Sequence, residues 1–230
     1  MIINDTQVQT LIEALPYLRD FKDKTIVVKY GGNAMLNDQI KNKVLQDIVF
    51  LQCAGMRPVV VHGGGPEITA MLMQAGKKSE FVSGLRVTDA ESVGIAEMAL
   101  VGKINTDLVA RLNTLGGRAV GLNGKDANLV QAKKHLADVY ENGEVNLVDI
   151  GYVGNVEHVN TDLIEVLLAN GFIPVIAPTG VGSSGETYNI NADSVAGEIA
   201  GALKAEKLFV LTDVRGIYSD YRDENSFIST

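Results

Sequence analysis

The sequence contains short, unbroken runs of apolar residues separated by segments with helical periodicity. Strand-like runs are expected at residues 25–29, 58–61, 119–122, 173–177 and 208–211. Helical patterns are expected at residues 37–52, 66–74, 89–115, 161–169 and 193–203. Strands that are apolar on both faces are typical of parallel sheets covered by helices on both sides. The sequence therefore predicts an α/β protein with a mainly parallel central sheet.

Three segments depart from this alternation. Residues 128–156 alternate short apolar stretches with Asn142-Gly143 and Gly151, and residues 183–188 read SSGETY, so both segments are predicted to form hairpins. Ahead of the first strand, an apolar stripe predicts an amphipathic helix that either covers the core or packs on another subunit. Its members are Val8, Leu11, Ile12, Leu15 and Leu18, and Pro16 is expected to bend the helix.

Glycines follow the strands at the end where open α/β sheets bind ligands. Gly31 and Gly32 come soon after Lys29, and three consecutive glycines, residues 63–65, follow the next strand. The two common phosphate-binding motifs are absent. Ile68 stands where the dinucleotide motif requires glycine, and Asp126 follows Gly124-Lys125 where a P-loop requires Ser or Thr.

These glycine turns have two interpretations. Backbone N–H groups without a Cβ can approach an anion closely, and Lys29 would add a positive charge beside them. Alternatively, the glycines form tight strand-to-helix turns and Lys29 extends into solvent. A single glycine pair favours the second interpretation. Two such turns at neighbouring strand ends, one with an adjoining lysine, favour an anion-binding site.

Charge and composition narrow the classes of function. The 20 Lys and Arg residues against 28 Asp and Glu give a net charge of −8 without a concentrated basic patch, which argues against nucleic-acid binding. No apolar stretch approaches the ~20 residues that span a bilayer, and no signal peptide is recognised. The single cysteine, Cys53, excludes an internal disulfide and is expected as a small buried side chain in a helix. We expect a cytoplasmic protein without a membrane segment.

Several motifs together resemble the acetylglutamate kinases of the amino acid kinase family. They run in order from residue 25 to about residue 218: KYGGNAM (29–35), VHGGGPEI (61–68), GLRVTD (84–89), LVGKIN (100–105), DIGYVGNV (149–156), IPVIAPTG (173–180), YNINADSVAGEIA (188–200) and LTDVRGIY (211–218). The resemblance implies the amino acid kinase fold, a three-layer α/β/α sandwich. It also implies an enzyme of arginine biosynthesis that phosphorylates the side-chain carboxylate of N-acetyl-L-glutamate with ATP.

The resemblance also implies roles for individual residues. The implied catalytic residues are Lys29 and Asp193. The implied substrate-binding residues are Gly64, Gly65, Arg86, Asn189 and Asn191. The implied ATP- or phosphate-binding residues are Gly31, Gly32 and Asp213. Simpler interpretations are a surface position for Arg86, turn chemistry for the two asparagines and a helix cap for Asp193. His62 is expected to be structural, and no metal-ligating side chain is predicted.

The expected ligands and partners follow from the same resemblance. ATP enters as a co-substrate with Mg²⁺, without a tightly bound cofactor, and arginine is an expected inhibitor. Residues 1–23 are expected to form an interaction helix that joins subunits, giving a homo-oligomer, either a dimer or a hexamer. Residues 24–180 are expected to hold N-acetylglutamate and the dimer contacts, and residues 181–230 to begin the ATP-binding part.

One departure from the family pattern affects the expected activity. The family continues beyond the SFIST segment (226–230) with a second phosphate-facing lysine, so the C-terminal part is expected to be incomplete and the 230-residue chain poorly active. Two alternatives remain open at this point. The chain is either another member of the amino acid kinase family or a non-catalytic protein that binds N-acetylglutamate or a partner.

Overall fold

A computed structural model of the chain describes residues 5–31, 35, 37–141, 144–212, 216–220 and 222–228. Two residues with predicted roles, Gly32 and Asp213, lie outside the described residues, as does the Asn142-Gly143 turn.

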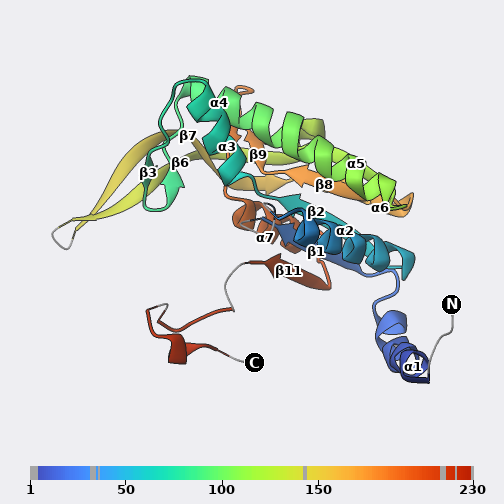
Figure 1. Cartoon of the computed structure of the whole chain (residues 1–230). Helices are drawn as coiled ribbons and strands as arrows, with labels where there is room; N and C mark the ends of the chain where they lie inside the picture. Colours follow the sequence, from blue (N-terminus) through green and yellow to red (C-terminus); the bar gives the residue numbers. More distant parts are fainter. Residues whose placement is uncertain are drawn as a thin grey trace.

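The centre of the molecule is a five-stranded parallel sheet with the strand order β11-β1-β2-β8-β5 (Figure 1). Each neighbouring pair of strands runs parallel, which confirms the predicted sheet. The strands are β1 (Thr25–Tyr30), β2 (Arg57–His62), β5 (Ala119–Asn123), β8 (Ile173–Ala177) and β11 (Lys207–Leu211).

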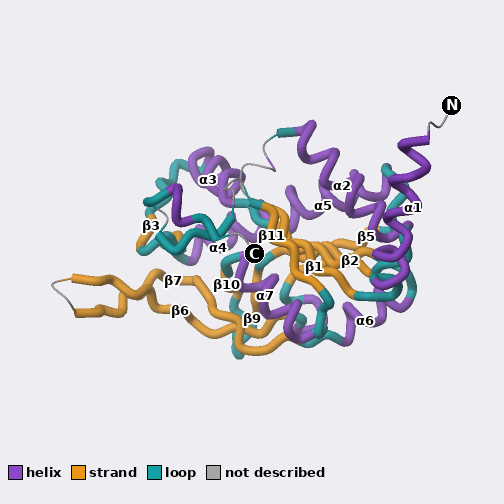
Figure 2. Tube along the Cα trace, turned by 90° about the horizontal axis from the view of Figure 1, so that it is seen from below, coloured by secondary structure: helices purple, strands orange, loops and turns teal. Residues whose placement is uncertain are grey.

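Helices cover both faces of this sheet (Figure 2). One face carries α2 (Asp38–Cys53), α3 (Gly65–Gln74) and a long helical segment, and the other carries α6 (Asp162–Ala169) and α7 (Ala192–Ala202). Because side chains alternate along a strand, Ile26 and Val28 contribute to the apolar cluster on the first face, while Val27 contributes to the cluster on the second. The predicted three-layer α/β/α arrangement is confirmed.

The helix predicted over residues 89–115 is continuous but contains an unexpected middle section. It consists of α4 (Ala90–Glu97), the π-helix η2 (Met98–Asn105) and α5 (Thr106–Thr114). In the π section each backbone N–H bonds five residues back rather than four. This changes which side chains share a face, and the apolar pattern of the sequence does not reveal it.

The predicted hairpins are also present. Strands β6 (Val130–Glu141) and β7 (Glu144–Val159) pair antiparallel, and the far end of this hairpin extends away from the rest of the molecule (Figure 1). Strands β9 (Thr179–Val181) and β10 (Thr187–Asn189) pair antiparallel and complete a closed barrel with β6 and β7. A separate two-stranded ribbon is formed by β3 (Phe81–Val82) and β4 (Leu85–Arg86). Two short 3-10 turns are η3 (Asp126–Asn128) and η4 (Glu224–Ser226).

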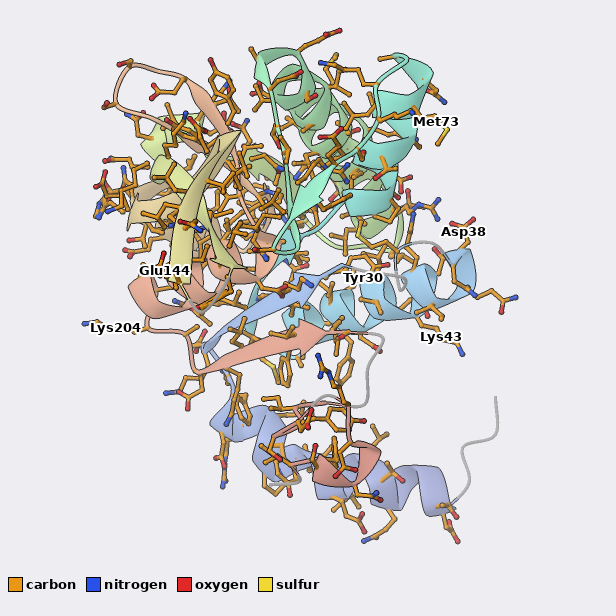
Figure 3. The ribbon with its side chains drawn as sticks, turned by 90° about the vertical axis from the view of Figure 1, so that its left-hand side faces the viewer. Tyr30, Asp38, Lys43, Met73, Glu144 and Lys204 are labelled. Carbon is orange, nitrogen blue, oxygen red and sulfur yellow. The ribbon has the colours of Figure 1, made fainter. Side chains whose placement is uncertain are left out.

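The N-terminal helix α1 (Asp5–Asp20) lies apart from the sheet (Figure 1) and includes Pro16 within its length. Figure 3, which views the molecule from its side, shows α1 below the sheet layer, whereas Tyr30 lies at the end of β1 beside α2. Most of the apolar stripe predicted for α1 is exposed, with Val8, Leu11, Ile12 and Leu15 open to solvent. The stripe therefore does not cover the core of its own chain.

The expectation that Cys53 is buried is wrong. Cys53 is the last residue of α2 and is exposed. The inward face of α2 carries Leu45, Ile48 and Val49. On the last turn this face continues at Gln52, whose side chain donates to the Gly171 carbonyl at 2.8 Å. Cys53 lies one position further round the helix and so turns away from the core.

None of the helices in the described part of the chain is both long and apolar enough to cross a membrane.

Candidate active site

A cavity of about 300 Å³ opens at the carboxyl ends of the central strands, where ligands bind in parallel α/β sheets. The walls come from the end of β1, the turn between β2 and α3, the β3–β4 ribbon, and the segment from β10 into α7. The structure brings together all the residues predicted to be catalytic or substrate-binding. These are Lys29, Gly64, Gly65, Arg86, Asn189, Asn191 and Asp193.

Lys29 is held at the floor of this cavity. Its Nζ lies 3.1 Å from Oδ1 of Asp193, which comes from the first turn of α7. The Lys29 side chain is only 13% exposed, so it does not extend into solvent. The contact between Lys29 and Asp193 fixes the ammonium group at the carboxyl end of strand β1.

Gly31, the described residue of the first predicted glycine turn, lies against the second turn beside Lys29. The Gly63 N–H donates to the Tyr30 carbonyl at 2.8 Å, which ties the turn after β2 to the end of β1. A Cβ on Gly31 would lie 3.3 Å from the Lys29 Nζ and 3.5 Å from the Gly63 nitrogen. A side chain at position 31 would therefore crowd the ammonium group, which supports the interpretation of these turns as an anion-binding site.

Arg86, at the end of β4, also lines the cavity. Its guanidinium donates to the Gly65 carbonyl at 3.0 Å, to Thr69 Oγ1 at 2.8 Å and to Ser79 Oγ. The guanidinium carbon also lies 4.7 Å from the centroid of the Phe81 ring, a cation–π geometry. Neutral groups on several sides thus hold the fork in one orientation at the cavity.

The charge of Arg86 has no acidic partner within the described residues. No carboxylate of those residues forms an ion pair with it, although the residue is only 7% exposed. Burial lowers the pKa of this guanidinium, and arginine nevertheless stays protonated. A buried, unpaired positive charge at a cavity favours an anionic ligand. The interpretation of Arg86 as a surface residue is wrong.

The two predicted asparagines occupy different local positions. Asn189 is the last residue of β10, and Asn191 is the N-cap of α7. The Asn191 side chain accepts from the Asp193 N–H at 2.8 Å. The cap of this helix is therefore Asn191 rather than Asp193, and the Asp193 carboxylate remains available for Lys29.

His62 behaves as the structural histidine predicted from the sequence. It ends β2, and its side chain is completely buried. Burial lowers the pKa of His62 to about 4, so the ring is neutral at physiological pH.

Sequence patterns missed several residues that shape the site. Thr69 and Ser79 accept hydrogen bonds from Arg86, and Phe81 stacks on it. Single residues of these types carry no distinctive sequence pattern. Glu97, at the end of α4, pairs with Lys125 at 2.7 Å and accepts from the Thr187 hydroxyl at 3.3 Å. The last contact links the long helix to β10. Among the described residues, no group of three or more His, Cys, Asp or Glu side chains is placed to hold a metal ion.

Comparisons with known sequences agree on one family. The sequence profile described as the amino acid kinase family matches residues 24–230. The acetylglutamate kinase of Moorella thermoacetica is 57% identical over 220 residues, which span 96% of this chain and 74% of that protein. The acetylglutamate kinase of Desulfitobacterium hafniense is 54% identical over 222 residues, again spanning 96% and 74% of the two chains.

Solved structures show the same fold. An N-acetylglutamate synthase from Neisseria gonorrhoeae, in complex with coenzyme A and N-acetylglutamate, matches with a TM-score of 0.76 and 28% identity. The match covers 92% of this chain and 46% of that one. Carbamate kinase from Giardia matches with a TM-score of 0.59 and 18% identity, covering 88% and 76% of the two chains, a likeness of fold alone.

Proposed function

The chain belongs to the amino acid kinase family, and from that premise we propose that it phosphorylates the side-chain carboxylate of N-acetyl-L-glutamate with ATP. The product is N-acetyl-L-glutamyl 5-phosphate, an acyl phosphate used in arginine biosynthesis, and the reaction takes place in the cytoplasm. The enzyme is a phosphotransferase of the kinase class, with ATP as its co-substrate. Mg²⁺ accompanies the ATP phosphates.

One observation carries this proposal. A single cavity is lined by two cationic groups, Lys29 and the buried Arg86, together with the glycine turn at residues 63–65. N-acetylglutamate has two carboxylates, one at each end of a short flexible chain. Arg86 receives the α-carboxylate through its planar fork. The side-chain carboxylate then lies toward Lys29, with Asn189 and the Gly64 and Gly65 amides as further contacts.

The chemistry of the step requires charge neutralisation rather than proton transfer. A carboxylate with a pKa near 4.3 is already ionised at neutral pH and needs no general base. One carboxylate oxygen forms a bond to the γ-phosphorus of ATP as the bond from that phosphorus to the β,γ-bridging oxygen breaks, and ADP departs with the bonding electrons. The protein must hold two anions in line and stabilise the charge on the moving phosphoryl group.

We assign that task to Lys29. Its ammonium group is fixed by Asp193 and lies next to the Gly31 turn, where backbone N–H groups approach a phosphate without an intervening side chain. The nucleotide binds on this side of the cavity, toward residues 181–230. N-acetylglutamate binds on the side formed by Arg86 and α3.

A coupled pair of assays tests the proposal. Calorimetry of the 230-residue chain with N-acetylglutamate measures binding without requiring turnover, and a hydroxamate assay with ATP detects the acyl phosphate. We expect binding of N-acetylglutamate in preference to glutamate, aspartate, carbamate and UMP. Binding without acyl phosphate formation in the presence of MgATP would indicate a non-catalytic binding protein. Preference for another acceptor would indicate a different activity within the family.

The quaternary structure forms a second part of the proposal. The enzyme is a homo-oligomer in which residues 24–180 supply dimer contacts and α1 joins dimers into a hexamer that arginine inhibits. The exposed apolar stripe of α1 supports this role. Leu11, Ile12 and Leu15 are exposed to solvent, and burying them against a partner subunit would stabilise the assembly.

A further inference from the structure

A buried polar pair, His62 and Asn105, lies beneath the glycine turn after β2. Their side chains are 0% and 3% exposed. The His62 Nε2 lies 3.1 Å from the Asn105 Nδ2, and the His62 Nδ1 lies 2.9 Å from the Gly63 carbonyl oxygen. The proposed phosphoryl transfer needs no proton from His62. The contacts connect the long helix to the first peptide of the glycine turn.

The partners of Asn105 determine which atom donates in each hydrogen bond between Asn105, His62 and Gly63. Its Nδ2 also lies 2.8 Å from the Val175 carbonyl oxygen and 3.4 Å from that of Leu122. Carbonyl oxygens only accept, so the atom facing them is the amide NH₂ group. The same group therefore donates to Nε2 of His62, which must lack a proton. The ring proton is on Nδ1, and it is donated to the Gly63 carbonyl.

The geometry of the peptide bond extends this contact to the cavity. The Gly63 carbonyl and the Gly64 N–H belong to one trans peptide, in which the two bonds point in opposite directions. His62 holds the Gly63 carbonyl on the side of the long helix that carries Asn105. The Gly64 N–H therefore points away from that helix. Gly64 is the N-cap of α3, where the first N–H groups have no partner within the helix. Both glycines line the cavity.

The π-helix makes this arrangement possible. A Cβ on Gly64 would overlap Leu100 and Ile104 of η2, so the π section packs directly on the glycine turn. In an α-helix, residues 100 and 105 would be separated by a rotation of about 140°. In the π section the bond from residue i to residue i+5 brings them to the same side. One helix face therefore contacts Gly64 and also presents Asn105 to His62.

We propose that Asn105 and His62 are positioning residues that orient the Gly63–Gly64 peptide so that the Gly64 N–H donates to the substrate anion in the cavity. This assignment rests on the proposed function, because it takes N-acetylglutamate as the anion. Its chemical basis is a single neutral tautomer of His62. The Asn105 amide donates to Nε2 of this ring, and the ring donates from Nδ1 to the Gly63 carbonyl.

Two substitutions of His62 separate this role from packing. An asparagine amide nitrogen occupies nearly the place of Nδ1, whereas a glutamine amide reaches nearly to the place of Nε2. His62→Asn can therefore still donate to the Gly63 carbonyl, and His62→Gln cannot. By calorimetry, we expect His62→Gln to weaken N-acetylglutamate binding at least tenfold and His62→Asn to remain within about threefold of wild type. Equal affinities for the two variants would overturn the assignment.

A second asparagine of the same long helix provides a matched control. Asn113 donates to the Ala119 carbonyl at 3.2 Å and accepts from the Ala119 N–H at 2.7 Å, away from the cavity. We expect Asn113→Ala to lower the melting temperature without changing affinity, and Asn105→Leu to lower both. If Asn105→Leu lowers only the melting temperature, Asn105 has no positioning role.

A measurement on the wild-type chain tests the proposal even if the variants fail to fold. In the ¹⁵N spectrum of the chain, which contains three histidines, we expect the His62 ring to be protonated only at Nδ1. A His62 signal protonated at Nε2 would overturn the assignment. If the wild-type chain shows this tautomer but does not bind N-acetylglutamate, the proposed function fails instead.

Discussion

The Lys29 ammonium nitrogen lies 3.1 Å from a carboxylate oxygen of Asp193, which joins the end of β1 to the first turn of α7. The two residues are far apart in the sequence, and both line the cavity at the carboxyl ends of the strands. Asp193 neutralises Lys29 only in part, because its own side chain is 55% exposed and hydrated. The lysine is therefore held in place yet can still attract a phosphoryl group.

Removal of Lys29 tests the electrostatic part of the mechanism. For Lys29→Ala we expect kcat to fall on the order of 10²–10³-fold, since one preorganised stabilising group is lost. The KM for N-acetylglutamate should change little, because Arg86 binds the other end of the substrate. Lys24→Ala is the control. Lys24 also forms an ion pair, with Glu206 at 3.3 Å, but lies at the opposite end of β1. A Lys29→Ala enzyme with wild-type kcat would contradict the mechanism.

Removal of Arg86 tests the assignment of the α-carboxylate. We expect Arg86→Gln to weaken N-acetylglutamate binding about 100-fold, or about 3 kcal/mol, as for other buried charge pairs that lose one partner. Isothermal calorimetry provides the measurement. Arg118→Gln is a matched control, since Arg118 also stacks on an aromatic ring, Phe172, at 4.3 Å. Similar losses of affinity in both variants would show that Arg86 has no specific role.

The buried His62 predicts a pH dependence of stability. Its pKa is about 4 in the folded protein and 6.5 in the unfolded chain, so the unfolded chain binds more protons between these values. Stability is therefore fully present above pH 6.5 and decreases as the pH falls toward 4, by roughly 3 kcal/mol from this residue. Urea unfolding at pH 7 and pH 4.5 measures the loss.

The comparison of two histidine variants isolates that contribution. His62→Asn should show a smaller loss of stability between pH 7 and pH 4.5 than wild type. His158→Gln should behave like wild type, because His158 is exposed on β7. A His62→Asn protein with the full wild-type pH dependence would mean that other groups account for it.

The exposed stripe of α1 predicts a change of oligomeric state. We expect the double substitution Leu11→Asp/Leu15→Asp to reduce the particle mass measured by light scattering and to remove inhibition by arginine, as deletion of residues 1–20 should. The introduced carboxylates would have to be buried against the partner subunit, and burying an unpaired charge disfavours the assembly. Gln9→Ala is the control, since Gln9 bonds Glu13 on the polar side of the same helix. Unchanged mass in the double variant would exclude α1 from the assembly.

The sequence predicts the central sheet well because its strands are uninterrupted apolar runs. The same pattern cannot show which strand lies at an edge. Leu208, Phe209 and Val210 look like core residues in sequence, yet all three are exposed in β11. Among the described residues, β11 lies at the end of the strand order and pairs with β1.

The candidate site was predictable where glycines and charges form motifs. It was not predictable where the fold brings ordinary residues together. Ser79 and Thr69 contact Arg86 only because α3 and the β3–β4 ribbon meet there. The π section was equally hidden, because the same residue types suit an α-helix. The contact of Asn105 with His62 depends on that local geometry.

The two walls of the cavity are supported by very different backbones. Strand β1, which carries Lys29, hydrogen-bonds to β11 on one edge and to β2 on the other. In the described part of the chain, the ribbon that carries Arg86 pairs its own two short strands and joins β7 through the Thr88 backbone. It also packs on a small apolar cluster formed by Ala137, Ile150 and Val153. Local opening should therefore cost less free energy at the ribbon than at β1, which has a hydrogen-bonded strand on each side. Substrate would then enter and leave through movement of the ribbon, while β1 and Lys29 stay in place.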